Sequence, residues 1–334
     1  MNRIVKIIVP FFTAIVALGS CGNDNDDSQY KGILHQPPYA VLTDSIKDEP
    51  KNDELYFRRA VLLNSNNLPE PALADFKKAW SLKKDERYAY GVSNLLLTKK
   101  ADSAILFLNQ ALQELPESFL LRLTLARSLS AQNKTDEALK ACEELLQKNP
   151  TQVDVLKMKA DLLDRKGNKA AAISTLEKAY NLTPYDVELN YMWALKLAEA
   201  KNSRVISLCD SLGRADSGGH HAEPYYYKGI YYSNTGDKAK AFSEFNEAIR
   251  HDYTFMDAYI EKGAILYEQK NYAAAYKVFD LAASISQQFA AAYYWRGKCE
   301  EATGQKNEAK LDYTRAFALD NTFTEAKEAA DKLK

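Results

Sequence analysis

The sequence predicts an all-α fold, a solenoid of about eight helical hairpins stacked one on another. Two observations predict it. Small residues recur about every 34 residues between positions 60 and 297, and a series of alanines follows twelve residues behind them. A fixed period of this length is typical of units that cannot bury their apolar faces alone. At 334 residues and a formal net charge of −1, the chain has room for such an array.

The chain begins with a segment typical of an export signal. Two basic residues, Arg3 and Lys6, precede an apolar run over residues 7–18 and a pair of small residues. The run is shorter than the roughly 20 apolar residues that a spanning helix needs, and no later segment approaches that length. We therefore expect residues 1–20 to be removed as a signal peptide.

A cysteine, Cys21, follows this segment directly. The tetrapeptide Leu18-Gly19-Ser20-Cys21 resembles the lipobox of bacterial lipoproteins, in which the cysteine is acylated and becomes the first residue of the mature protein. Acyl chains would hold the protein on a lipid bilayer, since each buried methylene contributes about 0.8 kcal/mol.

The residues after Cys21 are polar and acidic, and they have nothing to bury. We expect residues 21–37 to form the acylated cysteine and a flexible tether. The acidic run at 22–28 is similar to the stretch that some Bacteroidota-type lipoproteins carry when they are moved to the cell surface. A merely solvated linker explains the same residues equally well.

Three series of residues define the repeat. The first series has spacings of 32, 34, 34, 34, 35, 34 and 34 and consists of Ala60, Val92, Ala126, Ala160, Ala194, Gly229, Gly263 and Gly297. The second lies twelve residues further on and consists of Ala72, Ala104, Ala138, Ala172, Ala241, Ala275 and Ala309. The third follows seven residues later, at Ala79, Ala111, Leu145, Ala179, Ala248, Ala282 and Ala316. Small side chains let the two helices of a hairpin approach closely while large neighbours fill the adjacent space.

Turn residues separate the two helices of each hairpin. The segment Asn234-Thr235-Gly236-Asp237 offers a glycine suited to a left-handed helix end and an aspartate suited to an N-cap. Gly167 and Gly304 occupy the same turn in the fourth and eighth repeats. The whole pattern resembles the tetratricopeptide repeat family over roughly residues 53–323. The resemblance implies a right-handed superhelical solenoid of about eight such repeats.

Some positions depart from the family pattern. The tyrosine that opens the first helix of several repeats is replaced in the middle of the array, by Arg122, Leu156 and Asn190. The fifth repeat is the weakest, although a step of 35 from Ala194 to Gly229 predicts that the solenoid continues through it. Because both ends of an array must be covered, we expect capping helices at residues 38–52 and 324–334.

Little in the sequence indicates catalysis. Of four histidines, only the pair His220-His221, near Asp216 and Glu223, has company suited to a metal, and adjacent histidines on a turn are more often solvated. The sequence has no phosphate-binding glycine loop, nucleophile elbow or His-Glu-x-x-His motif. The remaining cysteines, Cys142, Cys209 and Cys299, fall at apolar positions and are expected in the core. We therefore expect no enzyme, no cofactor and no metal, and the near-neutral charge does not favour a nucleic-acid partner.

The resemblance implies that the first helices line a concave groove where partners bind. We expect the partner-binding residues on the face of these helices that packing leaves free, at Tyr191, Tyr226, Tyr227, Ile230, Tyr294 and Trp295. Tyrosine and tryptophan are enriched at binding hot spots. The alternative is a packing role, because a tyrosine at this position is common in the family.

These features together predict a lipid-anchored scaffold that binds protein or peptide partners through its groove. We expect it in the bacterial cell envelope, anchored to the outer membrane at its periplasmic face or at the cell surface. The alternative is a surface-exposed lipoprotein that binds a glycan or nutrient for a transporter. A metal-dependent enzyme is the least favoured interpretation.

Overall fold

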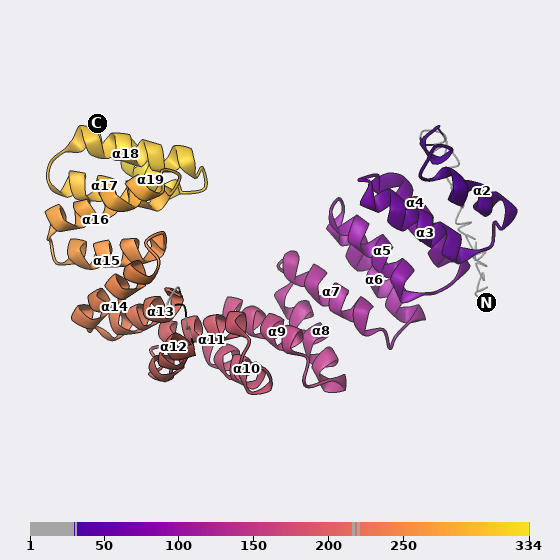
Figure 1. The fold of residues 1–334 in the computed structure, drawn as a ribbon, viewed down its shortest axis with the longest axis horizontal. Coiled ribbons are helices and arrows are strands. Elements are labelled where there is room, and N and C mark those ends of the chain that lie inside the picture. The colour runs from indigo at the N-terminus through magenta and orange to yellow at the C-terminus, as the bar shows by residue number, and fades with distance from the viewer. Residues whose placement is uncertain (1–29, 31, 216–217, 219–220, 334) are drawn as a thin grey trace, which may run out of the picture. The chain divides into compact units, whose positions relative to one another are not determined.

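The computed structural model describes residues 30, 32–215, 218 and 221–333, and the regular elements in these ranges are helices, with no strand among them (Figure 1). The helices are α2 (Ala40–Asp48), α3 (Asp53–Ser65), α4 (Pro69–Leu82), α5 (Glu86–Leu97), α6 (Ala101–Glu114), α7 (Phe119–Ala131), α8 (Thr135–Lys148), α9 (Val153–Arg165), α10 (Lys169–Leu182), α11 (Val187–Glu199), α12 (Arg204–Ala215), α13 (Glu223–Thr235), α14 (Lys238–His251), α15 (Met256–Glu268), α16 (Tyr272–Ile285), α17 (Ala290–Ala302), α18 (Lys306–Leu319) and α19 (Thr324–Lys332). The first helix of each hairpin has an odd number, from α3 to α17, and the second has an even number. None of the described helices is long and apolar enough to cross a membrane.

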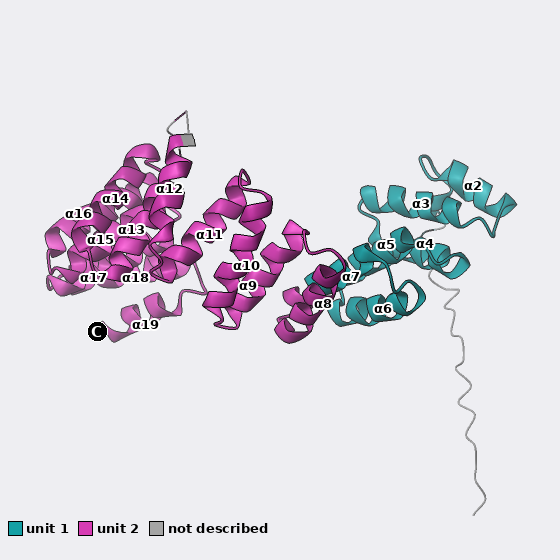
Figure 2. Cartoon of the chain, turned by 90° about the horizontal axis from the view of Figure 1, so that it is seen from below, with its two compact units in different colours: residues 1–128 teal, residues 129–334 magenta. Residues whose placement is uncertain are grey.

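The chain divides into two compact units, Met1–Ser128 and Leu129–Lys334, so that the division falls inside α7 (Figure 2). In unit 1, successive helices from α2 to α6 pack against one another. In unit 2, each helix from α8 to α19 packs against the next. The predicted helical repeat solenoid is therefore confirmed.

The three series of small residues lie where the helices of each hairpin meet. Their alanines are at most 2% exposed. At Gly263 a Cβ atom would lie 2.4 Å from the ring of Phe279, sixteen residues further on. A Cβ atom at Gly229 would likewise lie 2.4 Å from the ring of Phe245, and one at Gly297 would lie 3.0 Å from the ring of Tyr313. Glycine therefore accompanies a large ring at the facing position, and the small-residue series has the packing role that the sequence predicts.

The turn between the two helices has the same backbone conformation in seven of the described hairpins. One residue in each turn has φ between 56° and 89°: Asn67, Asn133, Gly167, Lys201, Gly236, Lys270 and Gly304. The next amide donates to the carbonyl oxygen five residues earlier, as from Asp237 to Tyr232 at 2.9 Å. This is the Schellman arrangement that ends a helix in a left-handed residue.

The second repeat differs from the others. Its first helix, α5, has 12 residues, whereas α3 and α7 have 13 each. The described turn after α5 has no residue of positive φ, and the amide of Lys100 donates instead to the carbonyl of Leu96, at 2.7 Å. The spacing of 32 between Ala60 and Val92 has another origin, because Ala79 and Val92 are 13 residues apart where Ala111 and Ala126 are 15 apart, so the two missing residues lie before Val92.

A hydrogen bond explains why the tyrosine at the start of the first helix can be replaced. Tyr56, Tyr259 and Tyr293 each donate a phenol hydrogen to the carbonyl six residues earlier, at 3.1 to 3.3 Å. The Arg122 guanidinium donates to the carbonyl of Pro116 at 2.9 Å, and the Asn190 carboxamide donates to that of Pro184 at 2.9 Å. Two of the three replacements therefore keep a donor at this position, whereas Leu156 has none and is buried instead.

The ends of the array and its weakest repeat are all helical. Leu34, inside the segment expected as a tether, is 7% exposed, and its carbonyl accepts the Thr43 hydroxyl at 2.7 Å. The packed chain thus begins before residue 38. Helix α19 buries Ala326 and Ala330 at the other end. In the fifth repeat, α12 is present and buries Val205.

The three described cysteines, Cys142, Cys209 and Cys299, are free and buried, as the sequence predicts. Burial raises the pKa of the Cys142 thiol to about 11 and the pKa of Cys209 and Cys299 to about 12. These side chains are therefore neutral core residues at physiological pH.

Candidate functional site

A cavity of about 590 Å³ opens on the first helices of unit 1, where the sequence analysis placed no site. Helices α3 and α5 form its two sides, and Leu120 of α7 also lines it. Most of its surface is apolar, and the lining includes Phe57, Val61, Phe76, Tyr90, Leu95 and Leu97. Val61 is 43% exposed and Tyr90 is 38% exposed, so two large apolar side chains face solvent there.

The absence of a side chain at Gly91 gives the cavity its shape. A Cβ atom at Gly91 would lie 2.6 Å from the ring of Phe76, which comes from α4. Only glycine therefore lets this ring lie against α5 where it lines the cavity. Two asparagines, Asn64 and Asn94, also line the cavity and are exposed. Their carboxamides can donate to and accept from the backbone of a bound segment.

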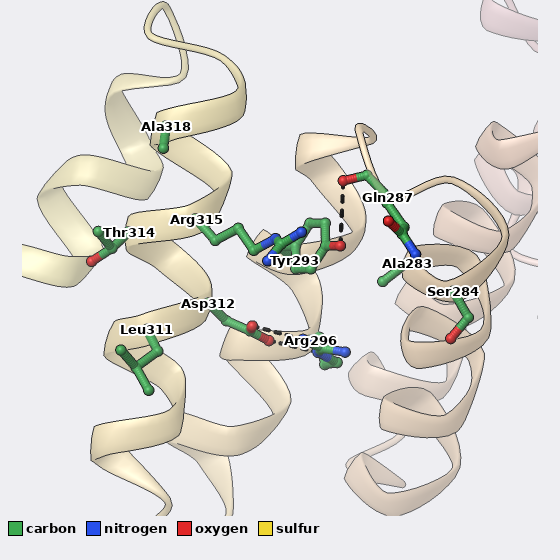
Figure 3. Close-up of a pocket in the computed structure, with 10 residues that line it drawn as sticks. All are labelled: Ala283, Ser284, Gln287, Tyr293, Arg296, Leu311, Asp312, Thr314, Arg315 and Ala318. Carbon is green, nitrogen blue, oxygen red and sulfur yellow. Dashed lines mark hydrogen bonds and ion pairs between the residues drawn. The ribbon is translucent and has the colours of Figure 1, made fainter.

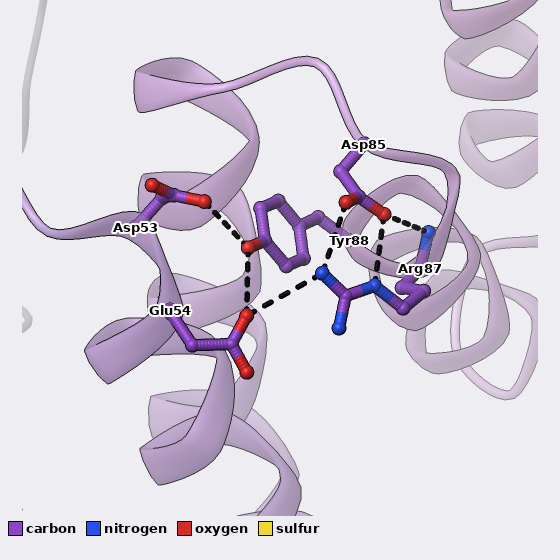
Figure 4. Close-up of polar contacts among 5 residues, drawn as sticks. All are labelled: Asp53, Glu54, Asp85, Arg87 and Tyr88. Atoms are coloured by element: carbon purple, nitrogen blue, oxygen red, sulfur yellow. Dashed lines mark hydrogen bonds and ion pairs between the residues drawn. The ribbon is translucent and has the colours of Figure 1, made fainter.

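One end of the cavity is charged and held in place by polar contacts (Figure 4). The Arg87 guanidinium donates to both carboxylate oxygens of Asp85, at 3.0 and 3.1 Å, and lies 5.0 Å from the ring centre of Phe57. This hydrogen bonding lowers the pKa of the Asp85 carboxyl. The buried Tyr88 hydroxyl donates to Asp53 at 2.6 Å, and burial raises the pKa of that phenol. The charges at this end are therefore largely satisfied within the protein.

Three of the aromatic residues predicted to bind a partner form a row in unit 2. The ring of Tyr191 from α11 lies 5.9 Å from that of Tyr227, and Tyr227 lies 5.8 Å from Tyr226, both from α13. Tyr226 also contacts Phe255 at 5.1 Å, in the connection before α15. Ile230 packs beside Tyr226 in the same cluster. We call Tyr191, Tyr226 and Tyr227 the tyrosine row.

Tyr294 and Trp295 belong to a second aromatic group at the C-terminal end of unit 2. Trp295 stacks on the buried Phe279 with ring centres 5.7 Å apart. Tyr294 lies 4.8 Å from Phe323, which occupies the same place in its repeat as Phe255 does beside Tyr226. Both rings are half-buried and join one repeat to the next, so packing uses part of each of them. Partner binding by the six predicted residues stays a prediction.

A cavity of about 700 Å³ lies between α16, α17 and α18 (Figure 3). Arg296 donates to both oxygens of Asp312, at 2.6 and 2.8 Å, and to Asp280 at 2.7 Å. Arg315 lies over the ring of Tyr293 at 4.7 Å. The first repeat has the same bidentate pair, from Arg59 to Asp75 sixteen residues later, at 2.6 and 2.8 Å. The pair therefore recurs between the helices of a hairpin, and we interpret this cavity as part of the packing.

Two predicted features lie wholly or partly outside the described residues. The lipobox cysteine, Cys21, lies outside them. In the candidate metal group around the histidine pair, His220 and Asp216 also lie outside them. His221 is described, and its ring lies 6.1 Å from that of Tyr191, with a ring nitrogen 3.9 Å from the Glu223 carboxylate. Within the described ranges, no group of three or more His, Cys, Asp or Glu residues is placed to hold a metal ion.

The fold and these surfaces define a class of protein, the helical repeat proteins that bind along an extended face. The chain belongs to the tetratricopeptide repeat family, whose models match residues 95–162, 129–196, 226–288 and 290–323.

Among solved structures, the chain is similar to a tetratricopeptide repeat protein from Parabacteroides merdae, with a TM-score of 0.58 and 20% identity over 73% of this chain and 96% of that one. It is also similar to YrrB, a tetratricopeptide repeat protein described as having an unusual peptide-binding site, with a TM-score of 0.41 and 21% identity over 65% and 95% of the two chains. No curated protein matches the sequence.

Proposed function

We propose that this chain is a non-catalytic scaffold that binds protein partners on the faces of its first helices. The cavity of unit 1 is the observation that carries the proposal. It is about 590 Å³ in volume and mostly apolar, and it exposes Val61 and Tyr90. Exposed apolar surface of this kind is typical of an interaction site. The lining has no arrangement of nucleophile and base, which favours binding over catalysis.

We further propose that acylation of Cys21 anchors the scaffold to a membrane of the cell envelope, on its periplasmic face or at the cell surface. The lipobox-like tetrapeptide that ends at Cys21 supports this proposal. The test is membrane fractionation of the parent and a Cys21→Ala variant, together with the mass of the N-terminal peptide of the parent. The variant should leave the membrane fraction while the parent stays in it. An unmodified N-terminal cysteine in the parent would contradict the proposal.

Photo-crosslinking tests the binding site. A photoreactive residue placed at position 61 should capture a defined partner in intact envelopes, because this side chain is exposed at the cavity. The same residue at position 41 is the matched control, since Val41 is 76% exposed but lies on α2, outside the cavity lining.

A charge at the cavity provides the second arm of the test. Val61→Glu should abolish capture from a neighbouring position such as 64, whereas Val41→Glu should not. Both variants should keep the helicity of the parent because both positions face solvent. Equal capture from positions 61 and 41, or capture that survives Val61→Glu, would argue against this cavity as the binding site.

A further inference from the structure

A basic residue recurs in the first helices, directly before a member of the first small-residue series. Five repeats have it, at Arg59, Lys159, Lys228, Lys262 and Arg296. In four of them a carboxylate from a second helix pairs with it. These pairs are Arg59 with Asp75 at 2.6 Å, Lys159 with Glu143 at 3.0 Å, Lys228 with Glu244 at 3.2 Å and Arg296 with Asp312 at 2.6 Å.

These carboxylates come from two positions. One lies sixteen residues after the basic residue, in the same hairpin, and the other lies sixteen residues before it, in the preceding repeat. Arg296 uses both positions, since it also donates to Asp280 at 2.7 Å. At Lys262 the two positions hold Val278 and Asn246, and among the described residues no carboxylate pairs with its ammonium. Lys262 is therefore the exception in the series.

The surroundings of Lys262 are polar on one side only and are open to solvent. Its ammonium lies 5.3 Å from the ring centre of Phe242, in α14. Lys262, Phe242, Asn246 and Val278 are each half-buried, so part of each side chain is exposed. In the eighth repeat the equivalent residue, Arg296, lines the cavity between α16, α17 and α18 (Figure 3). This position can therefore be reached from solvent between successive second helices.

The lysine of the preceding repeat shows what the missing carboxylates would do. Lys228 is half-buried as Lys262 is. Burial disfavours the charge of Lys228, but Glu244 and Asp210 outweigh it and raise the pKa of the ammonium. At Lys262 burial acts alone and lowers the pKa. The chain thus holds this cation partly out of water without the anion that compensates its equivalents.

We propose that Lys262 binds a carboxylate from outside the chain, the side chain of an aspartate or glutamate of a partner segment. A carboxylate accepts charge-assisted hydrogen bonds from an ammonium, and it is the group that this position binds in the other four repeats. An apolar segment would cover the ammonium without offering an acceptor. A free anion would gain this one contact only, whereas a partner segment adds contacts of its own. The site lies beside the second helix α14 of unit 2 and goes beyond the proposed function, whose cavity lies on the first helices of unit 1.

The test follows the lysine side-chain signals of the full mature chain by nuclear magnetic resonance, with isotope-labelled lysine. Lys262→Arg and Lys277→Arg assign two signals, and Lys277 is the internal control because it is exposed on the neighbouring helix α16. A blocked peptide of alternating serine and glutamate should shift the Lys262 signal in a saturable way, with half-saturation at a concentration at least tenfold lower than for Lys277. The same peptide with glutamine should leave it unchanged. Equal responses of the two lysines would overturn the proposal.

Sodium acetate separates a partner segment from a free anion. At equal carboxylate concentration, acetate should shift the Lys262 signal at least tenfold more weakly than the glutamate peptide. If acetate acts as strongly as the peptide, the site takes a small anion and the proposed partner is wrong.

Variants that supply the missing carboxylate place the site. Asn246→Asp puts a carboxylate where Asp280 precedes Arg296, so the response of Lys262 to the glutamate peptide should fall at least tenfold. Asn181→Asp makes the same charge change at an exposed position of α10 and is the matched control.

Val278→Glu supplies the carboxylate from the other position, as Glu244 does in the sixth repeat, and provides a second variant if the first does not fold. Circular dichroism shows which variants are folded. Equal effects of Asn246→Asp and Asn181→Asp would show that only net charge matters and would overturn the proposal. Folded Asn246→Asp and Val278→Glu variants that respond to the peptide as the parent does would overturn it as well.

Discussion

Glycine at position 263 should be required by the ring that faces it. A Cβ atom at Gly263 would lie 2.4 Å from two ring atoms of Phe279, which is completely buried and cannot move away freely. Gly263→Ala adds about 1 kcal/mol of helix propensity but costs about 1 to 3 kcal/mol for overpacking. We therefore expect a net loss of stability of up to ~2 kcal/mol.

A second substitution should relieve the clash. The fourth repeat has Ala160 where the seventh has Gly263, and Leu176 where the seventh has Phe279. Phe279→Leu alone should cost roughly 1 to 3 kcal/mol, because it leaves a cavity. In the double variant the new methyl group fills part of that cavity. Its loss of stability should therefore be smaller than the sum of the two single losses, by ~1 kcal/mol or more.

The assay is chemical denaturation followed by circular dichroism, with hydrogen exchange of α15 and α16 as the local measurement, because long arrays can unfold in more than one step. Gly213→Ala in α12 is the matched control. Its Cβ would come no nearer than 3.9 Å to the Tyr225 hydroxyl, so this variant should gain stability. A Gly263→Ala variant as stable as the parent, or strictly additive losses in the double variant, would refute the reasoning.

Three further changes test other features of the fold. Glu300 is 6% exposed with one carboxylate oxygen unpaired, and burial raises its pKa to about 7. Its ionised form is therefore disfavoured in the fold, and the stability of the protein should fall as pH rises from about 4.5 to 7. At pH 8 the Glu300→Gln variant should be more stable than the parent by at most about 3 kcal/mol. Equal melting temperatures of variant and parent at pH 8 would contradict this. Lys270 has φ 60°, so Lys270→Gly should stabilise by ~1 kcal/mol, whereas Gly304→Ala at φ 86° should destabilise similarly in urea denaturation. Ala138 is fully buried, so Ala138→Trp should lower the melting temperature markedly, because overpacking costs more than ~1 kcal/mol. An unchanged melting temperature would show that Ala138 does not lie between packed helices.

Much of the fold could be predicted because each repeat has the same packing of small and large residues at the same positions. The small-residue series fixed which residues of each helix meet, and burial of Ala138 and its equivalents follows from that spacing alone. The left-handed turn was visible only where glycine marks it, as at Gly167 and Gly236. Lys201 and Lys270 adopt the same conformation without any such signal, and the amide after each donates to the carbonyl five residues earlier as in the glycine turns.

The candidate site was harder to predict. The tyrosine at position 226 was expected on an open face, but its contact with Phe255 joins residues 29 positions apart, a distance that no helical period connects. The cavity of unit 1 depends on the approach of Phe76 to Gly91 across two repeats. No spacing in the sequence indicates this approach, because the small-residue series connects the two helices of one hairpin and not a ring of one repeat with a glycine of the next.

The hydrogen bond at the start of the first helices has a consequence for how this array can diverge. The accepting carbonyl tolerates donors of different shape, since it accepts from the phenol of Tyr56, the guanidinium of Arg122 and the carboxamide of Asn190. The fourth repeat has Leu156 at this position, which offers no donor at all. A ring, a cation and a neutral amide are thus interchangeable there for the architecture, and Tyr56 and Asn190 are buried, at 9% and 2% exposed. Neutral drift at this one position can therefore change the side chain while the hairpin stays the same, so the residue type found there is a poor guide to where a repeat of this array begins.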